Sequence, residues 1–286
     1  MKRVSIAHSP DADDIFMYYA IKFGWVDTKS KFENIALDIE TLNQSALNNI
    51  YDISAISFAL YPHIFDEYAL LRTGVSFGYG YGPKLVKRKD KKLKKNFKVA
   101  LSGKYTTNAF IFKLFYPEAR IYYMNFLDIE NAVLSGEVDA GVLIHESILN
   151  YSSELEVEAE IWDLWCELNR QNLPLPLGGM AIRRSIPLLD AIYHEESLIK
   201  AVDIANKHKK VLSNMLIERN LVRVDAVELD KYLNMYANEE SISLNETQIK
   251  AIDLLFKIGY EKSIFDKEIK VEESLIDLNY KNLRFS

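Results

Sequence analysis

The segment LPLPLGGMAIRR, at residues 173–184, indicates how the chain is folded. Proline has no backbone amide and restricts the residue before it, so the two Leu-Pro pairs exclude a helix and predict an extended segment. A second extended segment is predicted near residues 79–86, where the sequence is rich in glycine. Between and around these segments, strands and helices alternate. A chain that crosses to a second α/β unit and then returns predicts two lobes with a cleft between them.

Short apolar runs that alternate with helical periodicity predict a largely parallel sheet in each unit. In the first unit, strands are expected at residues 4–7, 35–41 and 53–57, and helices at residues 15–25, 44–49 and 59–71. In the second unit, strands are expected at residues 97–101, 119–124 and 141–144, and helices at residues 105–115, 127–134 and directly after 144. The pattern from residue 186 onward is mostly helical, with clear candidates at residues 198–220 and 246–258. We therefore expect residues 1–86 and 183–286 to form one lobe, and residues 87–182 to form the other.

The composition is that of an ordinary globular enzyme or binding protein. Of the 286 residues, 49% are hydrophobic and 27% are charged, and the net charge of −6 argues against nucleic acid as the main partner. The single cysteine, Cys166, excludes an intrachain disulfide and a thiolate metal cluster, and its helical surroundings predict a packing role. The N-terminal sequence has no apolar core of a signal peptide, and no window reaches the ~18 apolar residues of a membrane span. These features predict a cytoplasmic protein whose partners are neither nucleic acid nor membrane. They leave the oligomeric state open between monomer and homodimer.

The segment VDAGVLIHES, at residues 138–147, places His145 at the end of a predicted buried strand. Ligands of α/β sheets bind beyond the carboxyl ends of the strands. Histidine is the side chain most often used for general acid–base catalysis, because its neutral and protonated forms both exist near neutral pH. The alternative is an inert histidine that caps the strand or fills the core. Glu146 has two candidate roles, which are orienting the imidazole and stabilising the first turn of a following helix.

The loop after the first predicted strand, SPDADD at residues 9–14, contains three aspartates. Such a cluster suggests a metal site. However, acidic residues at a helix start also stabilise the helix, and no matching group of His or Glu is present. We therefore favour helix capping and expect no metal. Ser9 and Asp14 are candidates to face the cleft.

The segment SGKYTTN, at residues 102–108, follows a predicted strand and opens a predicted helix. Hydroxyl side chains and a glycine turn at a helix start expose backbone amides to an anion. The spacing of a Walker A loop is absent, which favours a carboxylate or a hydroxylated ligand over a nucleotide phosphate. Simple capping is the alternative, and the same ambiguity applies to Asn43, Ser54 and Ser57 at the predicted strand ends of the first lobe.

Two further motifs are interpreted as structural segments rather than binding sites. The glycines of GYGYG, at residues 78–82, lack the spacing of a dinucleotide-binding loop and predict a hinge strand. The basic run at residues 87–95 is interpreted as a solvated loop rather than a nucleic-acid site.

Taken in order along the chain, several segments resemble one family. They are HSPDADDIFMYYAI, ETLNQSAL, ISAISFALY, GYGYGPKLV, GKYTTNAFIF, LSGEVDAGVLIHES and LPLPLGGMAIRR. These segments are similar to the 1,4-dihydroxy-6-naphthoate synthases of the futalosine pathway to menaquinone. The resemblance covers about residues 3–184, continues more loosely near the C-terminus, and is most specific at the IHE segment and the Thr-Thr pair. The family often has Cys-Pro-Asn where this chain has Asp11, Ala12 and Asp13, so no role is carried over to those three residues.

The resemblance implies the two-lobed fold of type II periplasmic binding proteins and a lyase activity. The implied small-molecule substrate is cyclic dehypoxanthinyl futalosine, and the implied product is 1,4-dihydroxy-6-naphthoate with release of the sugar-derived fragment. No metal or organic cofactor is implied. The family's proton-abstracting histidine falls on His145. The family's substrate-binding strand end falls on Ala55, Ile56 and Ser57, and its helix-start contacts fall on Thr106, Thr107 and Asn108. With the residues argued above from their positions, Ser9, Asp14 and Asn43, these are the candidate substrate-binding residues.

Three other classes of protein are alternatives. Chorismate dehydratase of the same pathway shares the fold, but the IHE and TTN segments favour the naphthoate synthase. A non-catalytic solute-binding protein usually needs export, and the chain shows no signal peptide. A regulatory effector domain is the third alternative, but no DNA-binding segment is evident.

Overall fold

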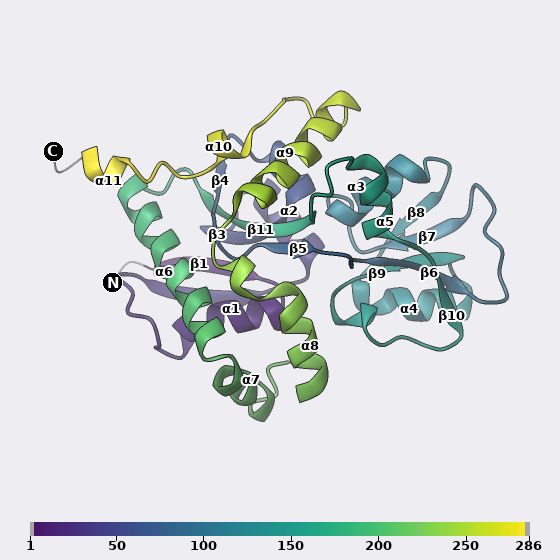
Figure 1. Cartoon of the computed structure of the whole chain (residues 1–286), viewed down its shortest axis with the longest axis horizontal. Coiled ribbons are helices and arrows are strands. Elements are labelled where there is room, and N and C mark those ends of the chain that lie inside the picture. Colours follow the sequence, from purple (N-terminus) through teal and green to yellow (C-terminus); the bar gives the residue numbers. More distant parts are fainter. Residues whose placement is uncertain (1–2, 223, 284–286) are drawn as a thin grey trace.

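The computed structural model describes residues 3–222 and 224–283, and it contains two sheets that form the centres of two adjacent lobes (Figure 1). The sheet of the first lobe has the strand order β2-β1-β3-β11-β4, with β5 paired to β11. Its strands are β1 (Arg3–His8), β2 (Lys31–Ala36), β3 (Ile53–Ser57), β4 (Tyr68–Leu70), β5 (Ser76–Gly78) and β11 (Leu175–Arg183). The first three are parallel, whereas β11 is antiparallel to β3, β4 and β5.

The sheet of the second lobe has the strand order β10-β6-β9-β7-β8. Its strands are β6 (Lys84–Arg88), β7 (Lys98–Leu101), β8 (Arg120–Tyr123), β9 (Ala140–Leu143) and β10 (Leu155–Glu160). Strands β7, β8 and β9 are parallel, whereas β6 is antiparallel to both of its neighbours. The sheets are therefore mixed, and the prediction of largely parallel sheets is wrong for the strands next to the crossings. The first residue of β6 pairs with the last residue of β9, so β6 enters its sheet at the edge where the parallel strands end.

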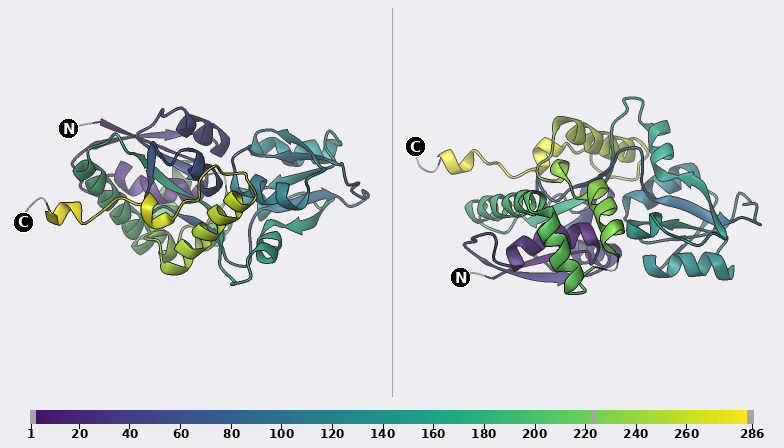
Figure 2. Two further views of the ribbon diagram at one scale, coloured as in Figure 1. Left: turned by 90° about the horizontal axis from the view of Figure 1, so that it is seen from above. Right: turned by 60° about the horizontal axis from the view of Figure 1, so that its bottom comes forward.

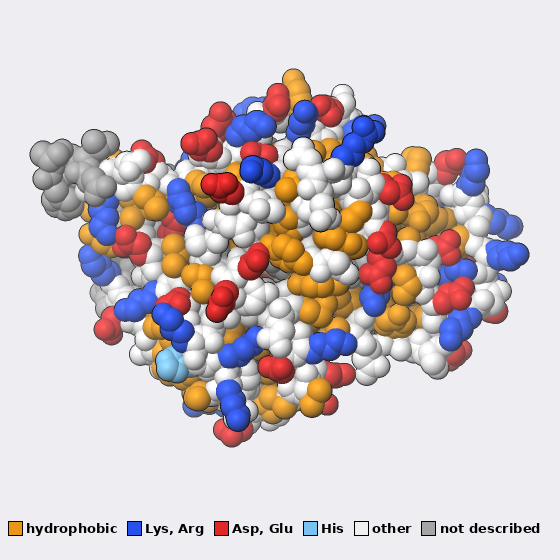
Figure 3. Space-filling view, viewed as in Figure 1, with side chains coloured by type: hydrophobic (Ala, Val, Ile, Leu, Met, Phe, Trp, Pro, Cys, Tyr) orange, Lys and Arg blue, Asp and Glu red, His pale blue; other side chains and the backbone are white. Residues whose placement is uncertain are grey.

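Helices pack on these sheets (Figure 2). In the first lobe they are α1 (Ala12–Lys22), α2 (Ile39–Leu47), α6 (Leu188–Lys207), α7 (Lys209–Glu218), α8 (Ala226–Tyr236), α9 (Glu246–Glu261), α10 (Val271–Ser274) and α11 (Tyr280–Leu283). The second lobe has α3 (Thr107–Phe115), α4 (Phe126–Ser135) and α5 (Ile161–Leu168). Short 3-10 helices are η1 (Phe58–His63), η2 (His145–Ile148) and η3 (Glu239–Ser241). A continuous core of buried apolar side chains runs through both lobes. Further apolar side chains gather on the surface near the junction of the lobes (Figure 3).

The chain crosses between the sheets twice, from β5 to β6 and from α5 to β11. Strand β6 belongs wholly to the second sheet and β11 wholly to the first. The lobe boundaries expected from the sequence, after residue 86 and after residue 182, fall inside these two strands. The crossings themselves lie just before each strand, next to the carboxyl ends of β9 and β3.

Four of the predicted elements differ from the structure. The sequence predicts a strand at residues 35–41 and a helix at residues 44–49, but β2 ends at Ala36 and α2 already begins at Ile39. Asp38 starts this helix because its carboxylate accepts hydrogen bonds from the amides of Glu40 and Thr41. Residues 59–71, predicted as a helix, form η1 and then β4. The helix predicted at residues 198–220 is two helices that meet at His208.

The basic run at residues 87–95 is a loop only in part. Residues 89–95 form an exposed loop apart from the half-buried Leu93, whereas Lys87 and Arg88 belong to β6 and are half-buried. Cys166 is half-buried on α5, where burial raises the pKa of its thiol. In the described part of the chain, no helix combines the length and the apolar character needed to cross a membrane.

Candidate active site

A cleft between the two lobes collects most of the predicted site residues. It contains about 750 Å³ of empty space, part of it open to solvent. Of the predicted residues, Ser9, Asp14, Ala55, Ile56, Ser57, Thr106, Thr107, Asn108 and His145 line it. Asn43 does not line the cleft, and it lies behind Ser57.

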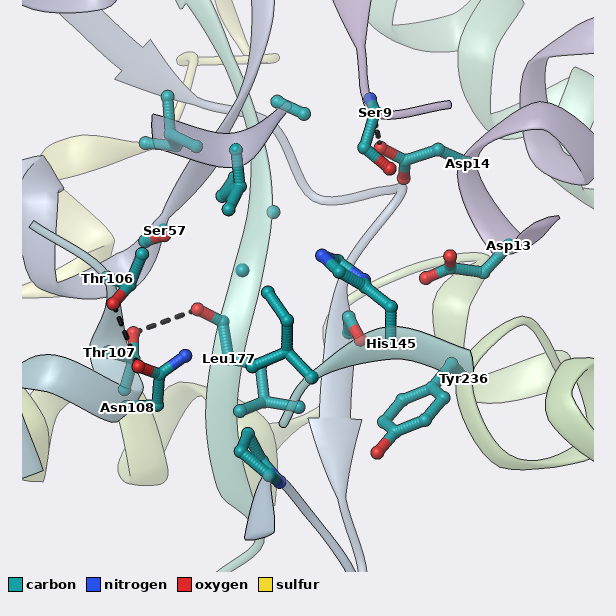
Figure 4. Close-up of a pocket in the computed structure, with 18 of the residues that line it drawn as sticks. Ser9, Asp13, Asp14, Ser57, Thr106, Thr107, Asn108, His145, Leu177 and Tyr236 are labelled. Atoms are coloured by element: carbon teal, nitrogen blue, oxygen red, sulfur yellow. Dashed lines mark hydrogen bonds between the residues drawn. The ribbon is translucent and has the colours of Figure 1, made fainter. Parts of the chain in front are cut away.

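His145 begins η2, one residue beyond the end of β9, and reaches into the cleft from the second lobe (Figure 4). Its Nδ1 lies 3.0 Å from Oδ2 of Asp11, a fully buried residue at the start of α1. A carboxylate carries no hydrogen to offer the ring, so this ion-pair contact favours a proton on Nδ1. The other ring nitrogen, Nε2, has no hydrogen-bond partner among the described residues. Phe126 packs edge-on against the ring at 5.0 Å between centroids. The imidazole is thus held in one orientation with one nitrogen available.

Glu146, the residue after His145, does not orient the imidazole. Oε1 of Glu146 accepts a hydrogen bond of 3.1 Å from the backbone amide of Ala12, the first residue of α1. The carboxylate therefore stabilises a helix start, but the helix belongs to the other lobe. His145 and Glu146 both contact the SPDADD loop across the cleft. The partner of the imidazole is Asp11, a residue to which the sequence assigned no role.

The three aspartates of the SPDADD loop have different surroundings. Asp14 lines the cleft and accepts a hydrogen bond of 2.8 Å from the amide of Ser9. Burial raises the pKa of Asp14, while His8 and the Ser9 amide act in the opposite direction. Asp13 also lines the cleft, and burial, reinforced by neighbouring carboxylates, raises its pKa well above the ordinary value. Asp11 lies behind them against the imidazole.

The opposite wall of the cleft is the start of α3 (Figure 4). The Thr106 hydroxyl caps this helix by accepting from the Ala109 amide, and it lies 3.0 Å from Oδ1 of Asn108. The carbonyl of Gly103, at 3.1 Å, is a second acceptor for the hydroxyl proton, and neither contact uses the amide NH2 group of Asn108. The Thr107 hydroxyl donates to the carbonyl of Leu177 at 2.8 Å. Thr107 therefore ties the second lobe to β11, and its hydroxyl proton is already used.

Ser57 presents a hydroxyl to the cleft from the end of β3. Asn43, which is fully buried on α2, donates to Oγ of Ser57 at 3.1 Å and accepts from the Ser57 amide at 3.0 Å. This pair fixes the serine and leaves its hydroxyl proton for a ligand, since no described residue accepts it. Ser54 is buried and donates to the carbonyl of Ala55, so it does not serve the cleft.

Other parts of the cleft wall were not predicted. Tyr232 and Tyr236 of α8 line it, as do Gly178 and Gly179 of β11. The tyrosines lie in a helix with ordinary amphipathic spacing, and nothing in that pattern distinguishes them from core residues. Gly178 is different, because a Cβ there would lie 2.8 Å from the carbonyl oxygen of Ile56. The paired glycines of LPLPLGGM were therefore a signal of close backbone approach.

Within residues 3–222 and 224–283, no group of three or more His, Cys, Asp or Glu side chains is arranged to hold a metal ion.

Comparisons with known proteins agree with this geometry. The family described as menaquinone biosynthesis matches residues 4–261. The chain is 31% identical over 266 residues to the 1,4-dihydroxy-6-naphthoate synthase of Thermus thermophilus, covering 90% of this chain and 93% of that protein. It is 28% identical over 256 residues to the enzyme of the same name from Streptomyces coelicolor, covering 87% and 90%.

Solved structures give the same fold. A crystal structure of a protein from Archaeoglobus fulgidus matches with a TM-score of 0.84 and 33% identity, over 92% of this chain and 98% of that one. The alkanesulfonate-binding protein of Xanthomonas axonopodis pv. citri matches with a TM-score of 0.70 and 11% identity, over 96% and 98%. The second likeness shows the fold alone, and it confirms the predicted likeness to periplasmic binding proteins.

Proposed function

The chain belongs to the menaquinone biosynthesis family, and from this premise we propose that it is a lyase that converts cyclic dehypoxanthinyl futalosine to 1,4-dihydroxy-6-naphthoate. Two relatives that cover most of the chain are 1,4-dihydroxy-6-naphthoate synthases, so the chain is an enzyme of menaquinone biosynthesis. The catalytic part of the proposal rests on the surroundings of the two ring nitrogens of His145. One of its nitrogens is held by Asp11, and the other has no partner among the described residues.

His145 acts as the general base. With a proton on Nδ1, the lone pair of Nε2 is free to take a proton from a carbon of the substrate. Asp11 fixes this tautomer and stabilises the imidazolium that forms, as a buried carboxylate does in other base–carboxylate pairs. A well-placed base contributes about 10²–10⁴-fold to the rate. Formation of an aromatic ring supplies much of the driving force, and the proposal includes no cofactor.

The polar walls of the cleft hold the substrate. The free amides at the start of α3, together with the Asn108 side chain, suit the carboxylate of the substrate. The Ser57 hydroxyl and the Ser9–Asp14 pair suit its hydroxyl groups. Ala55, Ile56 and Thr107 complete the wall, while Asn43 acts only through Ser57.

Closing of the two lobes around the substrate excludes water and strengthens these contacts. For this motion we propose the lobe division given by sheet membership. One lobe contains the chain up to β5 and from β11 onward, and the other contains β6 to α5. We also propose that the enzyme works in the cytoplasm on this small molecule.

The test is an anaerobic incubation of the purified protein with cyclic dehypoxanthinyl futalosine, followed by mass spectrometry. The proposal expects the naphthoate from the wild type, and a kcat lower by about 10²–10⁴-fold in His145→Ala. His208→Ala is the matched control, because His208 is exposed at the junction of α6 and α7 and does not line the cleft. Near-normal kcat in His145→Ala removes the base from the mechanism. Unchanged substrate indicates a binding protein, and turnover of chorismate instead indicates chorismate dehydratase.

A further inference from the structure

Asp13 is a buried acid that the mechanism above does not use. It is the second residue of α1, it is 6% exposed, and it lines the cleft. Its carboxyl group lies on the same side of the cleft as Asp14 and is turned toward His145 (Figure 4). Its Oδ1 has no hydrogen-bond partner among the described residues. A buried polar atom without a partner is costly, so one that faces a ligand cleft is a candidate for a ligand contact.

Of the three aspartates in this loop, Asp13 has the weakest support for a negative charge. Asp11 has the imidazole nitrogen of His145 at 3.0 Å. Asp14 accepts the Ser9 amide at 2.8 Å and has His8 nearby. No comparable donor reaches Oδ1 of Asp13. When several carboxyl groups meet in a buried site, ionising all of them costs much free energy. A proton therefore stays on the carboxyl group that accepts the fewest hydrogen bonds.

The groups that face Asp13 come from each of the surrounding elements. They are Asp11 from the loop, Asp14 and Tyr18 from α1, His145 and Glu146 from η2, and Tyr232 and Tyr236 from α8. Burial is the largest cause that raises the pKa of Asp13, followed by the charges of Asp14, Asp11 and Glu146. No lysine or arginine is among the groups that shift this pKa. The surroundings of Asp13 therefore favour its neutral form.

We propose that Asp13 enters the reaction as a neutral carboxylic acid and donates its proton to the oxygen of the departing sugar-derived fragment. This inference rests on the proposed lyase reaction, in which a base and an acid are both needed. His145 and Asp13 line the same cleft, so a base and an acid can act on one bound substrate.

The proton transfers balance. Nε2 of His145 takes a proton from carbon, and the electron pair of that C–H bond forms the new double bond of the ring. The C–O bond to the fragment breaks, its electron pair stays on oxygen, and this oxygen takes the proton of Asp13. The step leaves an imidazolium and a carboxylate. Water carries the proton from His145 back to Asp13 after the product leaves, which restores both groups.

The test compares Asp13→Asn with the wild type in the naphthoate assay across pH. Asparagine has nearly the same shape and still donates a hydrogen bond, but it has no proton to transfer. We expect kcat to fall by about 10²-fold or more. An acid must be protonated to act, so wild-type kcat declines as rising pH ionises Asp13, and this alkaline decline is absent from the variant. Asp128→Asn makes the same change at an exposed residue of α4, and it is expected to leave kcat and its alkaline decline unchanged.

A variant with kcat within about threefold of the wild type and the same alkaline decline overturns the proposal, because a hydrogen bond alone would then suffice. The protonation state has a second readout that needs no variant and no turnover. Infrared spectra of the wild type with isotope-labelled aspartate are expected to show a protonated carboxyl band at neutral pH, and absence of that band also overturns the proposal. A wild type that shows the band but forms no naphthoate contradicts the proposed lyase reaction, and with it the acid role of Asp13. The two failures are therefore distinguishable.

Discussion

His145 has a backbone φ of 53°, in the left-handed region that residues other than glycine rarely adopt. A conformation of this kind costs of order 1–3 kcal/mol and persists only where the surroundings impose it. Here it turns the chain out of β9, so that the imidazole meets Asp11 and packs against Phe126. The orientation of the ring therefore depends on backbone strain, an aromatic contact and one carboxylate.

A single substitution can test the contribution of the Asp11 carboxylate to this arrangement. In Asp11→Asn, the new side chain can present an amide donor to Nδ1, which favours the tautomer with its proton on Nε2. We expect kcat to fall by about 10²-fold or more, as loss of the correct tautomer does in comparable pairs. KM should change little, because Asp11 does not line the cleft. Steady-state kinetics with Asp11→Glu as a partial rescue checks this. A rise in KM with normal kcat contradicts it.

The pKa of Asp13 also predicts how stability depends on pH. A carboxyl whose pKa is raised in the folded state binds its proton more tightly there than in the unfolded chain. Its contribution to stability is therefore present at low pH, and it is lost as pH rises above the unfolded value near 3.9. Asp13→Asn removes this loss. Its free energy of unfolding should exceed that of the wild type increasingly with pH, by up to about 1.4 kcal/mol per pH unit. Urea unfolding at several pH values measures the difference, and parallel curves contradict the prediction.

For single residues, the sequence predicts which side chains reach the cleft better than it predicts which side chains they contact. A histidine after an apolar run and hydroxyl residues at a helix start are local patterns, so His145, Thr106 and Asn108 could be predicted. The contact between His145 and Asp11 joins distant parts of the chain, and no local pattern specifies it. The sequence of the loop predicts that its aspartates cap a helix. However, the structure has no side-chain cap at Asp11, because that carboxylate faces the imidazole.

Among the elements, α2 shows why the alternation of apolar and polar residues alone predicts the wrong start for a helix. Its first residues alternate as in a strand, and only the hydrogen bonds of Asp38 show where the helix begins. The early start puts Asn43 in the middle of the helix, behind β3. A residue predicted to bind substrate instead holds Ser57, the residue that does face the cleft.

This arrangement predicts the effect of Asn43→Ala. The change leaves the amide of Ser57 without its acceptor and frees the serine side chain to rotate. Loss of one buried hydrogen-bonding partner costs about 1–3 kcal/mol, so KM should rise about tenfold while kcat changes less. The matched control is Asn48→Ala, because Asn48 is exposed at the end of the same helix. Equal effects of the two substitutions contradict a role that depends on Ser57.

The strand that presents His145 depends on Gly141 for close packing. A Cβ at this position would lie 2.4 Å from Cγ2 of Ile129 and 2.9 Å from Cγ2 of Val133, both on α4. Gly141→Ala should therefore push α4 away from β9 and reduce the free energy of unfolding by about 1–3 kcal/mol. Chemical denaturation measures this loss. Combining it with Ile129→Ala, which makes room, should cost less than the sum of the single effects, and strict additivity contradicts the steric explanation.

For the whole molecule, the sequence predicts two lobes and a cleft because the Leu-Pro pairs and the glycine-rich segment mark both crossings. It does not predict that the crossing strands are antiparallel to their neighbours. That direction is set by where each strand enters its sheet. The same entry points bring the ends of β3 and β9 next to the crossings. The site therefore lies where a change in the angle between the lobes acts directly on it.

Contacts across the cleft lie on two sides of it. On one side η2 reaches α1, through His145 with Asp11 and Glu146 with the Ala12 amide. On the other side Thr107 holds the carbonyl of Leu177. The same short segment thus carries both the proposed base and a link between the lobes. Because the link and the base are neighbours, the proposed closing of the lobes would form the contact of His145 with Asp11 together with that of Glu146 with the Ala12 amide.

Glu146→Ala tests the link without removing the base. A hydrogen bond to a charged group is worth about 1.5–3 kcal/mol, so its loss should shift the balance between closed and open arrangements by roughly tenfold or more. Small-angle X-ray scattering of the protein without substrate should then give a larger radius of gyration than for the wild type, and saturating substrate should reduce the difference. Glu137→Ala, at an exposed residue just after α4, is the matched control. If both variants scatter as the wild type does, the Glu146 contact does not govern closure, and other contacts between the lobes, such as the stacked rings of Phe110 and Phe265, hold them instead.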